Sequence, residues 1–315
     1  MSGEFRATLA SRRSVLVPLD APYIAGGVWI YGSTSKLGVL ANQLTGWLAG
    51  RSVTMVPGTN AVWEPPFTLL QFQEWLNRAS DVVNKGISTW IVQLPRDRRR
   101  RRFNLLLLGS SRAPVAFAKF TENPANPLAL EALKRFDDEP TRAFWSPGLL
   151  STDRVGNMSV VMSTPMPNRR HWPATLKPET RYKILEEIRG RLGDLAHPDA
   201  FVHGDFAPWN VRRLADAGIA VVDWEEATKG VAGADALWFV LCSKAGARSN
   251  HKGVLSELKA GGRYSEDEVV AAARFWLHRL DQDEAAEIDP EEEMPAKLNT
   301  FGGRLRSMLE RIAEA

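Results

Sequence analysis

The chain has 315 residues, with 40 lysines and arginines, 37 aspartates and glutamates, a formal net charge of +3 and one cysteine. Its hydrophobic share of 44% and charged share of 24% are ordinary for a globular protein, and its length allows a large buried core. The balanced charge gives no argument for binding nucleic acid, and a single cysteine excludes an internal disulfide. No apolar run of 18 residues occurs, so no membrane span is expected. Prolines interrupt the segment after the N-terminal arginines, so we expect a cytoplasmic protein without a secretory signal.

The first segment, residues 1–85, is expected to be an N-terminal extension. Short apolar runs at residues 15–19 and 28–31 predict strands, and apolar residues at helical spacing predict helices over 37–48 and 68–84. A glycine and a lysine at positions 32 and 36 suggest a phosphate-binding loop. The second glycine of that motif is missing, which favours a turn with a helix cap.

From residue 86 the pattern changes to strands. Alternating or continuous apolar runs predict strands at 87–92, 103–108 and 115–120, then a helix at about 127–136 and a strand from 158 to a proline at 165. Five consecutive arginines, at positions 98–102, separate the first two of these strands. They have two interpretations: a solvated hairpin tip, or a cationic loop that approaches phosphates or an anionic partner.

The remaining elements are mainly helical. An apolar stripe predicts a helix over 178–195, and further helices are expected from about residue 235, over 265–280 and over 296–315. A short apolar run at 218–222 predicts a strand between the first two of these helices. Acidic stretches at 281–284 and 291–293 suggest a solvated face or an attraction for a cationic substrate.

One motif carries the chemistry of the chain. His203-Gly204-Asp205 is followed five residues after the aspartate by Asn210, and Asp223 comes at the end of the next apolar run. One carboxylate can orient an attacking hydroxyl, while an amide and a second carboxylate can hold Mg²⁺, as phosphoryl transfer requires. A metal-dependent hydrolase that uses His203 and Asp205 is the alternative, although the other histidines are scattered along the chain.

This motif, with Trp224 and Glu225 directly after Asp223, resembles the aminoglycoside phosphotransferase and choline kinase family. Its members are small-molecule kinases with a protein-kinase-like fold. The resemblance implies a two-lobed α/β (α+β) fold, with a small, mainly β N-lobe and a larger, α-rich C-lobe. The corresponding domains are an N-terminal extension at 1–85, an N-lobe at 86–165 and a C-lobe with the catalytic loop at 166–315.

The resemblance also assigns roles to individual residues. Asp205 would be the catalytic residue that orients the acceptor hydroxyl, and Asn210 and Asp223 would bind Mg²⁺. Lys119, in the predicted strand at 115–120, resembles the kinase lysine that contacts the phosphates of the nucleotide. Glu131, in the following predicted helix, would be the partner of that lysine.

The adenine site is implied by position alone, at the connection between the lobes. The backbone from Met162 to Thr164 would contact adenine there. Asp235 is expected to be a helix N-cap or a brace for the catalytic loop. One departure from the family is clear, because no glycine lies between Ile87 and Leu108, where kinases carry a glycine-rich phosphate lid.

The predicted function is transfer of the γ-phosphate of ATP, with Mg²⁺, to a hydroxyl of a small molecule. We expect a sugar or glycan-linked acceptor, because Trp172, Trp209 and Trp224 lie near the motif and indole faces stack on sugar rings. The alternatives are an aminoglycoside phosphotransferase and a pseudokinase that binds nucleotide without transferring phosphate. Nothing in the sequence indicates an oligomeric state.

Overall fold

The computed structural model describes residues 3–8, 15–19, 44–45, 48, 58–94, 102–111, 113–167, 171–216, 218–243, 250–260, 263–287 and 299–314. The chain divides into two compact units. Unit 1 contains Met1–Ala174 and Val211–Val222, and unit 2 contains Thr175–Asn210 and Asp223–Ala315. Among the residues placed, no helix combines the length and the apolar character needed to span a membrane.

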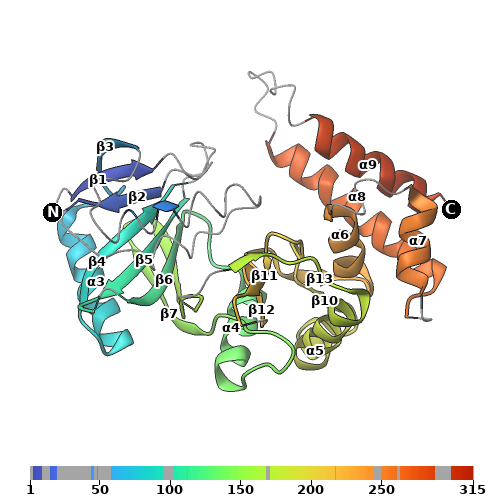
Figure 1. Cartoon of the computed structure of the whole chain (residues 1–315), viewed down its shortest axis with the longest axis horizontal. Coiled ribbons are helices and arrows are strands. Elements are labelled where there is room, and N and C mark those ends of the chain that lie inside the picture. Colours follow the sequence, from blue (N-terminus) through green and yellow to red (C-terminus); the bar gives the residue numbers. More distant parts are fainter. Residues whose placement is uncertain are drawn as a thin grey trace. The chain divides into compact units, whose positions relative to one another are not determined.

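Unit 1 is built on an eight-stranded sheet in the order β3-β1-β2-β4-β5-β6-β8-β7 (Figure 1). Every neighbouring pair of strands is antiparallel. The strands are β1 (Gly3–Thr8), β2 (Val15–Pro18), β3 (Gly58–Trp63), β4 (Ile87–Gln93), β5 (Arg102–Gly109), β6 (Pro114–Thr121), β7 (Leu149–Val155) and β8 (Met158–Ser163). Together they confirm the predicted strands at 15–19, 87–92, 103–108, 115–120 and from 158.

Three strands of this sheet, β1, β2 and β3, come from residues 1–85, and the N-terminal extension predicted there stays a prediction. β1 and β3 had no sequence signal of their own, and they pair across more than fifty residues, with Gly3 opposite Trp63. Pairing at such separation is decided by tertiary contacts, which local patterns do not record. The predicted strand at 28–31 lies outside the described residues, as does most of the predicted helix at 37–48.

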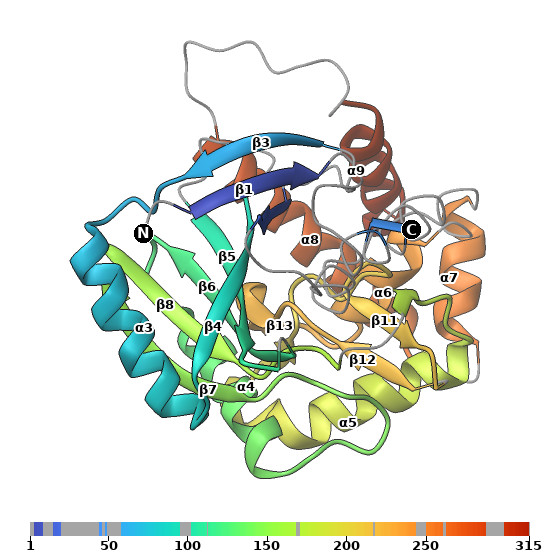
Figure 2. The same ribbon diagram turned by 60° about the vertical axis from the view of Figure 1, so that its left-hand side comes forward.

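Helix α3 (Leu69–Val83) covers one face of the sheet, where it packs on β4 and β7 (Figure 2). Thr68 and Gln71 form a capping box that fixes the start of this helix, as the predicted helix at 68–84 requires. Its buried side chains are Phe72, Trp75, Leu76 and Ala79. They join an aromatic core in which Phe103 and Phe120 stack with ring centroids 4.4 Å apart.

The opposite face of the sheet packs against a second, three-stranded sheet in the order β12-β11-β9. Its strands are β9 (His171–Pro173), β11 (Val211–Leu214) and β12 (Ile219–Val221). Side chains alternate between the two faces along β5, because Leu105 and Leu107 join the aromatic core while Leu106 and Leu108 face Leu214 and Ala220. Helix α4 (Pro127–Asp138) also belongs to unit 1 and confirms the predicted helix at 127–136.

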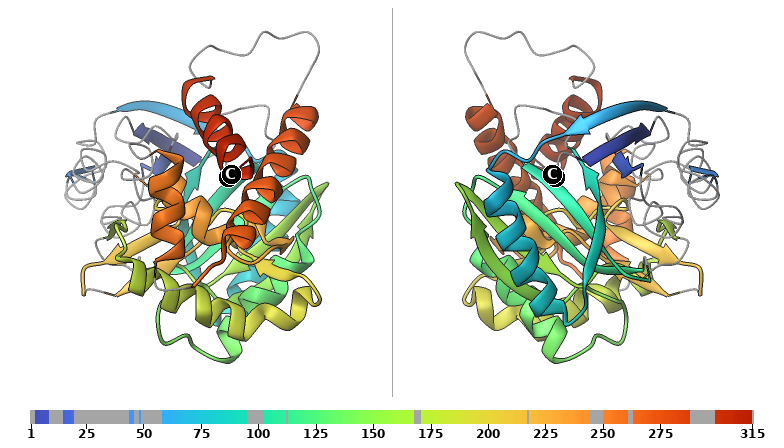
Figure 3. Two further views of the ribbon diagram at one scale, coloured as in Figure 1. Left: turned by 90° about the vertical axis from the view of Figure 1, so that its right-hand side faces the viewer. Right: turned by 90° about the vertical axis from the view of Figure 1, so that its left-hand side faces the viewer.

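Unit 2 is mainly helical (Figure 3). It also contains an antiparallel pair of short strands, β10 (Ala200–Val202) and β13 (Thr228–Gly230). Its α-helices are α5 (Pro178–Ala196), α6 (Ala234–Cys242), α7 (His251–Lys259), α8 (Glu266–Glu287) and α9 (Asn299–Ala313). Four of them confirm predicted helices. The fifth, α7, was not predicted, although the side chain of Asn250 caps it by accepting from the N–H of Gly253. Helices α8 and α9 lie side by side, and residues 281–284 of the first acidic stretch lie in α8.

Replacing Trp75 with alanine tests the aromatic core of unit 1. Trp75 is 2% exposed and contacts Phe72 and Phe120. The Trp75→Ala variant should lose about 3–5 kcal/mol in the free energy of unfolding, measured by urea denaturation of the full chain. Val82→Ala, on the exposed side of the same helix, is the control and should change it by about 0.5 kcal/mol or less.

Candidate functional site

The predicted catalytic loop, residues 203–210, follows β10 in unit 2 and contains a glycine that no other residue can replace without strain. Gly204 has φ +84°, in the left-handed region that side chains disfavour. A Cβ atom at this position would also collide with the carbonyl oxygen of Glu226. The middle residue of the His203-Gly204-Asp205 motif is therefore required by the backbone.

The side chain of Asp235 holds the backbone of this loop in place. Its carboxylate accepts from the N–H of His203 at 2.8 Å and from the N–H of Gly204 at 3.3 Å. The start of α6 is Gly233, without a side-chain cap, so the structure favours the brace over the N-cap that the sequence left open. Burial raises the pKa of Asp235 to about 7, while the two backbone donors act in the opposite direction.

Three side-chain N–H groups hold the carboxylate of Asp205. Oδ2 accepts from the indole of Trp209 at 3.1 Å and from the amide of Asn210 at 2.7 Å. Oδ1 accepts from the indole of Trp238, on α6, at 3.1 Å. The same Asn210 amide also donates to the backbone carbonyl of Asp205 at 3.0 Å, which closes the turn between the two residues.

The surroundings of Asp205 raise its pKa to about 6, mainly through burial. The negative charge of Asp223 adds to the rise, whereas the hydrogen bonds from Trp209, Trp238 and Asn210 lower it. The carboxyl is thus mostly ionised at neutral pH and still close enough to neutrality to exchange a proton. Such a pKa suits a group that accepts a proton during a reaction.

Asp223 lies near Asn210 because of the hairpin between them. β11 and β12 pair antiparallel with Val211 opposite Val221, so the residues that flank this hairpin emerge at one end of it. Asp223 itself has φ 73° and ψ 57°, a left-handed conformation uncommon outside glycine, asparagine and aspartate. Backbone conformations of this kind cluster at functional sites.

The donor atoms at this end of the hairpin suit a hard divalent cation. The amide nitrogen of Asn210 donates to Asp205, which leaves its oxygen as the atom able to bind a metal. Asp223 supplies a carboxylate. Mg²⁺ is commonly held by one or two carboxylates together with waters and substrate phosphates, and this small oxygen set fits that pattern. Within the described ranges, no cluster of three His, Cys, Asp or Glu side chains suited to a metal occurs.

The residues predicted to bind the nucleotide lie in unit 1. Lys119 is half-buried on β6, where its backbone lies opposite Asn104 of β5 and Val161 of β8. Glu131 is on α4, and its ion pair is with Arg135, one turn along the helix, at 3.4 Å. The predicted pair between Lys119 and Glu131 therefore stays a prediction.

Two of the residues predicted to contact adenine, Met162 and Thr164, make contacts within unit 1. The side chain of Met162 is buried in the aromatic core, and its backbone lies between β6 and β7. The N–H of Thr164 donates to the carbonyl of Gly148 at 2.9 Å, and the Thr164 hydroxyl accepts from the N–H of Gly148 at 2.8 Å. Both residues are thus engaged within unit 1, and their role in binding adenine stays a prediction.

One of the three tryptophans expected to bind a sugar is wrongly assigned. Trp224 is 2% exposed and packs on His203 with ring centroids 4.4 Å apart, so its faces are core surface. Trp209 is half-buried beside Asp205, and Trp172 is 39% exposed on β9. Of the five arginines at 98–102, the last begins β5 and the others lie outside the described residues.

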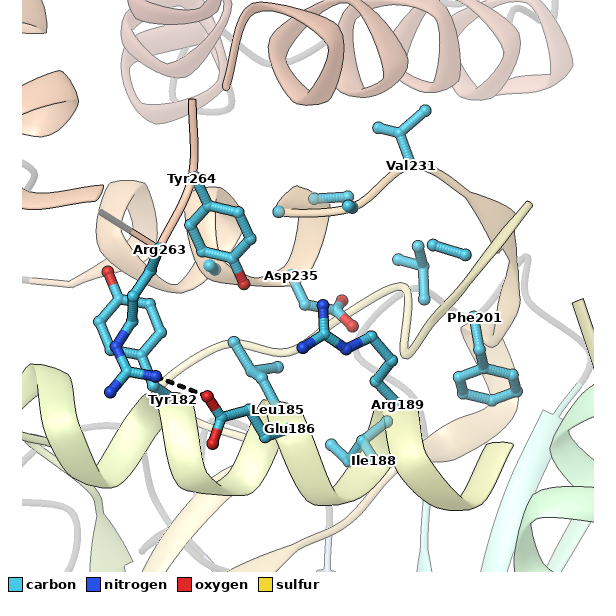
Figure 4. Close-up of a pocket in the computed structure, with 16 residues that line it drawn as sticks. Tyr182, Leu185, Glu186, Ile188, Arg189, Phe201, Val231, Asp235, Arg263 and Tyr264 are labelled. Carbon is cyan, nitrogen blue, oxygen red and sulfur yellow. Dashed lines mark hydrogen bonds and ion pairs between the residues drawn. The ribbon is translucent and has the colours of Figure 1, made fainter. Parts of the chain in front are cut away.

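A cavity of about 140 Å³ in unit 2 is lined in part by Asp235 (Figure 4). It is enclosed by α5, β10, the turn before α6 and the segment before α8. Arg189 points toward Asp235 across this space, and Arg263 pairs with Glu186 at its rim at 2.5 Å. Asp235, which accepts hydrogen bonds from the loop, therefore also lines this cavity.

The segment that contains this site matches a known family. Residues 164–254 match the phosphotransferase enzyme family, which confirms the predicted resemblance over the catalytic loop, the hairpin and α6. No curated protein sequence matches the chain. The matched segment contains Asp205, Asn210 and Asp223, and it spans less than half of the chain.

Several solved structures are similar to this chain at low sequence identity. Spectinomycin phosphotransferase APH(9)-Ia, in complex with ADP and spectinomycin, aligns with a TM-score of 0.50 and 10% identity, over 77% of this chain and 97% of that one. Choline kinase LicA from Streptococcus pneumoniae aligns with a TM-score of 0.45 and 10% identity, over 78% and 99%. A thermostable mutant of aminoglycoside phosphotransferase APH(4)-Ia aligns with a TM-score of 0.45 and 11% identity, over 76% and 100%. The first of these likenesses confirms the predicted kinase-like fold.

A Gly204→Ala substitution tests the backbone of the catalytic loop. The left-handed φ should cost about 1–3 kcal/mol, and the contact with Glu226 should add to that cost. We expect a lower midpoint of thermal unfolding. Gly190→Ala is the matched control, because a Cβ in that helical position meets nothing and should stabilise α5 by about 0.5–1 kcal/mol. Equal midpoints for the two variants would contradict the required glycine.

Proposed function

We propose that this chain is an ATP- and Mg²⁺-dependent phosphotransferase that moves the γ-phosphate to a hydroxyl of a small molecule. The observation that carries the proposal is the carboxylate of Asp205, which three N–H donors hold near the carboxylate of Asp223. This arrangement lies within the segment that matches the phosphotransferase family. A cytoplasmic location, as the sequence predicts, supplies the nucleotide.

The reaction needs one proton acceptor and one phosphate donor. The hydroxyl of the acceptor donates its hydrogen bond to Asp205, and its oxygen forms the new bond to the γ-phosphorus. The bond from that phosphorus to the β–γ bridging oxygen breaks, ADP leaves and the proton passes to Asp205. Mg²⁺, when bound, neutralises charge on the phosphates, and Asn210 and Asp223 are the residues proposed to hold it.

Unit 1 contributes the proposed nucleotide contacts. Lys119 would bind the phosphates from β6, with Glu131 as its partner in the nucleotide complex. The backbone near Met162 and Thr164 would contact the adenine. The nucleotide contacts are also where the chain departs most from the family that it resembles, because the glycine-rich phosphate lid is missing from its sequence.

For the acceptor, we propose a hydroxyl of a sugar or glycan-linked metabolite. Trp238 supports this choice, because its half-buried indole adjoins Oδ1 of Asp205 and aromatic side chains bind the apolar faces of sugar rings. An aminoglycoside is the second candidate, since spectinomycin is bound in the structure with the same fold. A strongly acidic cleft would suit such a polycation, whereas this chain carries a net charge of +3.

Transfer of labelled phosphate tests the function and the acceptor together. The purified chain is incubated with ATP or GTP labelled at the γ-position, Mg²⁺ and a panel of sugars, aminoglycosides and choline. We expect ATP-dependent labelling of a sugar, lost in Asp205→Asn. Labelling of aminoglycosides alone would overturn the acceptor. Nucleotide binding without transfer to any compound, and without ATP hydrolysis, would support a pseudokinase instead.

The Asp223→Asn variant tests the cation site. Asparagine keeps the shape of the side chain and tolerates a left-handed backbone, so the fold should be preserved while one ligand charge is lost. We expect kcat to fall about 100-fold or more at saturating ATP, with a weaker response to added Mg²⁺. Asp267→Asn, on the exposed first turn of α8, is the control. Undiminished turnover of Asp223→Asn would remove Asp223 from the site.

The pH dependence of turnover tests the role of Asp205. Only the ionised carboxylate accepts a proton, and its pKa is raised to about 6. kcat/KM for the acceptor should therefore be constant above that pH and fall about tenfold per pH unit below it. Nucleotide binding measured by calorimetry over the same pH range is the control, because phosphate groups titrate nearby. A flat kcat/KM between about pH 5 and about pH 7 would exclude Asp205 as the acceptor of the proton.

A further inference from the structure

The hydrogen bonds to Asp205 leave its two oxygens unequal. An ionised carboxylate offers about four acceptor positions, two on each oxygen. Oδ2 accepts from Trp209 and from Asn210, so both of its positions are used. Oδ1 accepts from Trp238, which leaves one position open on that oxygen among the contacts of the described residues.

The donor on Oδ1 is rigidly placed. Trp238 lies on α6, and its indole stacks on Trp276 of α8 with ring centroids 4.1 Å apart and an interplanar angle of 20°. The indole N–H of Trp276 donates to the carbonyl of Ala234 at 2.8 Å, and the guanidinium of Arg279 lies over the same ring. The direction of the Trp238 N–H is thus set by helix packing within unit 2.

The two indoles come from different elements. Trp209 lies in the catalytic loop one residue before Asn210, while Trp238 arrives from a helix that also carries the brace Asp235. Both are half-buried, and each gives its only nitrogen donor to the same carboxylate. The indole nitrogen of tryptophan is a donor only, so these contacts fix which edge of the carboxylate can accept a further hydrogen bond.

We propose that Trp209 and Trp238 are positioning residues that direct the acceptor hydroxyl onto Oδ1 of Asp205, beside the indole of Trp238. The proposal rests on the phosphotransferase function argued above and assigns which oxygen of Asp205 takes the proton. In this arrangement Trp209 holds Oδ2, the oxygen that the acceptor does not contact, while Trp238 holds Oδ1 and also borders the bound acceptor. The two substitutions Trp209→Phe and Trp238→Phe should consequently differ in their effect on the acceptor.

The first measurement does not depend on activity. In the full chain labelled with ¹⁵N-tryptophan, the indole N–H signals of Trp209 and Trp238 are assigned from the two Trp→Phe variants. Asp205→Asn should shift both signals, because the charge on their shared partner is lost. The signal of Trp90 should stay in place, since its indole nitrogen has no hydrogen-bond partner in the described residues. If neither of the two signals moves, the proposed contacts are overturned.

The second measurement separates the two indoles by kinetics. Both variants should lower kcat by about tenfold or more, with the KM for ATP changed less than about twofold. The KM for the acceptor should rise about fivefold in Trp238→Phe and stay within about twofold in Trp209→Phe. Equal changes in the two variants would overturn the assignment of Oδ1.

Two controls keep these outcomes interpretable. Trp90→Phe removes an indole N–H without removing a hydrogen bond and should leave both KM values unchanged. The midpoint of thermal unfolding shows whether the phenylalanine of Trp238→Phe preserves the packing against Trp276. If it does not, the Trp209→Phe variant on the loop still decides whether an indole positions Asp205. A wild-type chain that phosphorylates no acceptor would overturn the proposed function, while the indole signals would still decide whether the contacts exist.

Discussion

The catalytic loop depends on one buried carboxylate that receives backbone N–H groups. The carboxylate of Asp235 accepts from the backbone N–H groups of His203 and Gly204, and leaving these two groups buried without partners would cost about 1–3 kcal/mol each. The close approach of Glu226 to Gly204 is secured in turn by Arg279, which donates to the Glu226 carbonyl at 3.3 Å and pairs with its carboxylate at 2.6 Å. Helices α6 and α8 therefore hold the loop through polar contacts as well as through packing.

This arrangement gathers negative charge that the chain must offset. Asp205 feels the charge of Asp223, and Asp235 feels that of Asp205. Burial adds to the same effect, so ionised carboxylates would be costly here without donors. Three side-chain N–H groups on Asp205 and two backbone N–H groups on Asp235 supply them. For the carboxylate of Asp223, at the end of the β11–β12 hairpin, the proposed partner is Mg²⁺.

The sequence predicted the local elements well and the long-range contacts poorly. The motif from His203 to Asp223 could be read directly, because loop residues of fixed spacing define it. β1 and β3 could not, since their pairing joins residues far apart in the chain. The contact of Trp238 with Asp205 was missed, because it follows from the packing of α6 and a tryptophan within an apolar run is expected in the core. Trp224 was misjudged for the opposite reason, since adjacency to Asp223 in sequence does not expose its ring. Asn250 was the available signal for α7, as a capping residue before an apolar i, i+4 pair.

The stacked indoles of Trp238 and Trp276 give unit 2 a distinct optical signal. Trp63, Trp75 and Trp90 share the aromatic core under α3 in unit 1, whereas Trp238 and Trp276 stack in unit 2. Two nearly parallel indoles 4.1 Å apart couple their electronic transitions, which near-ultraviolet circular dichroism detects. That coupling reports the packing of α6 on α8. The loosening of these two helices on heating can thus be followed without any attached label.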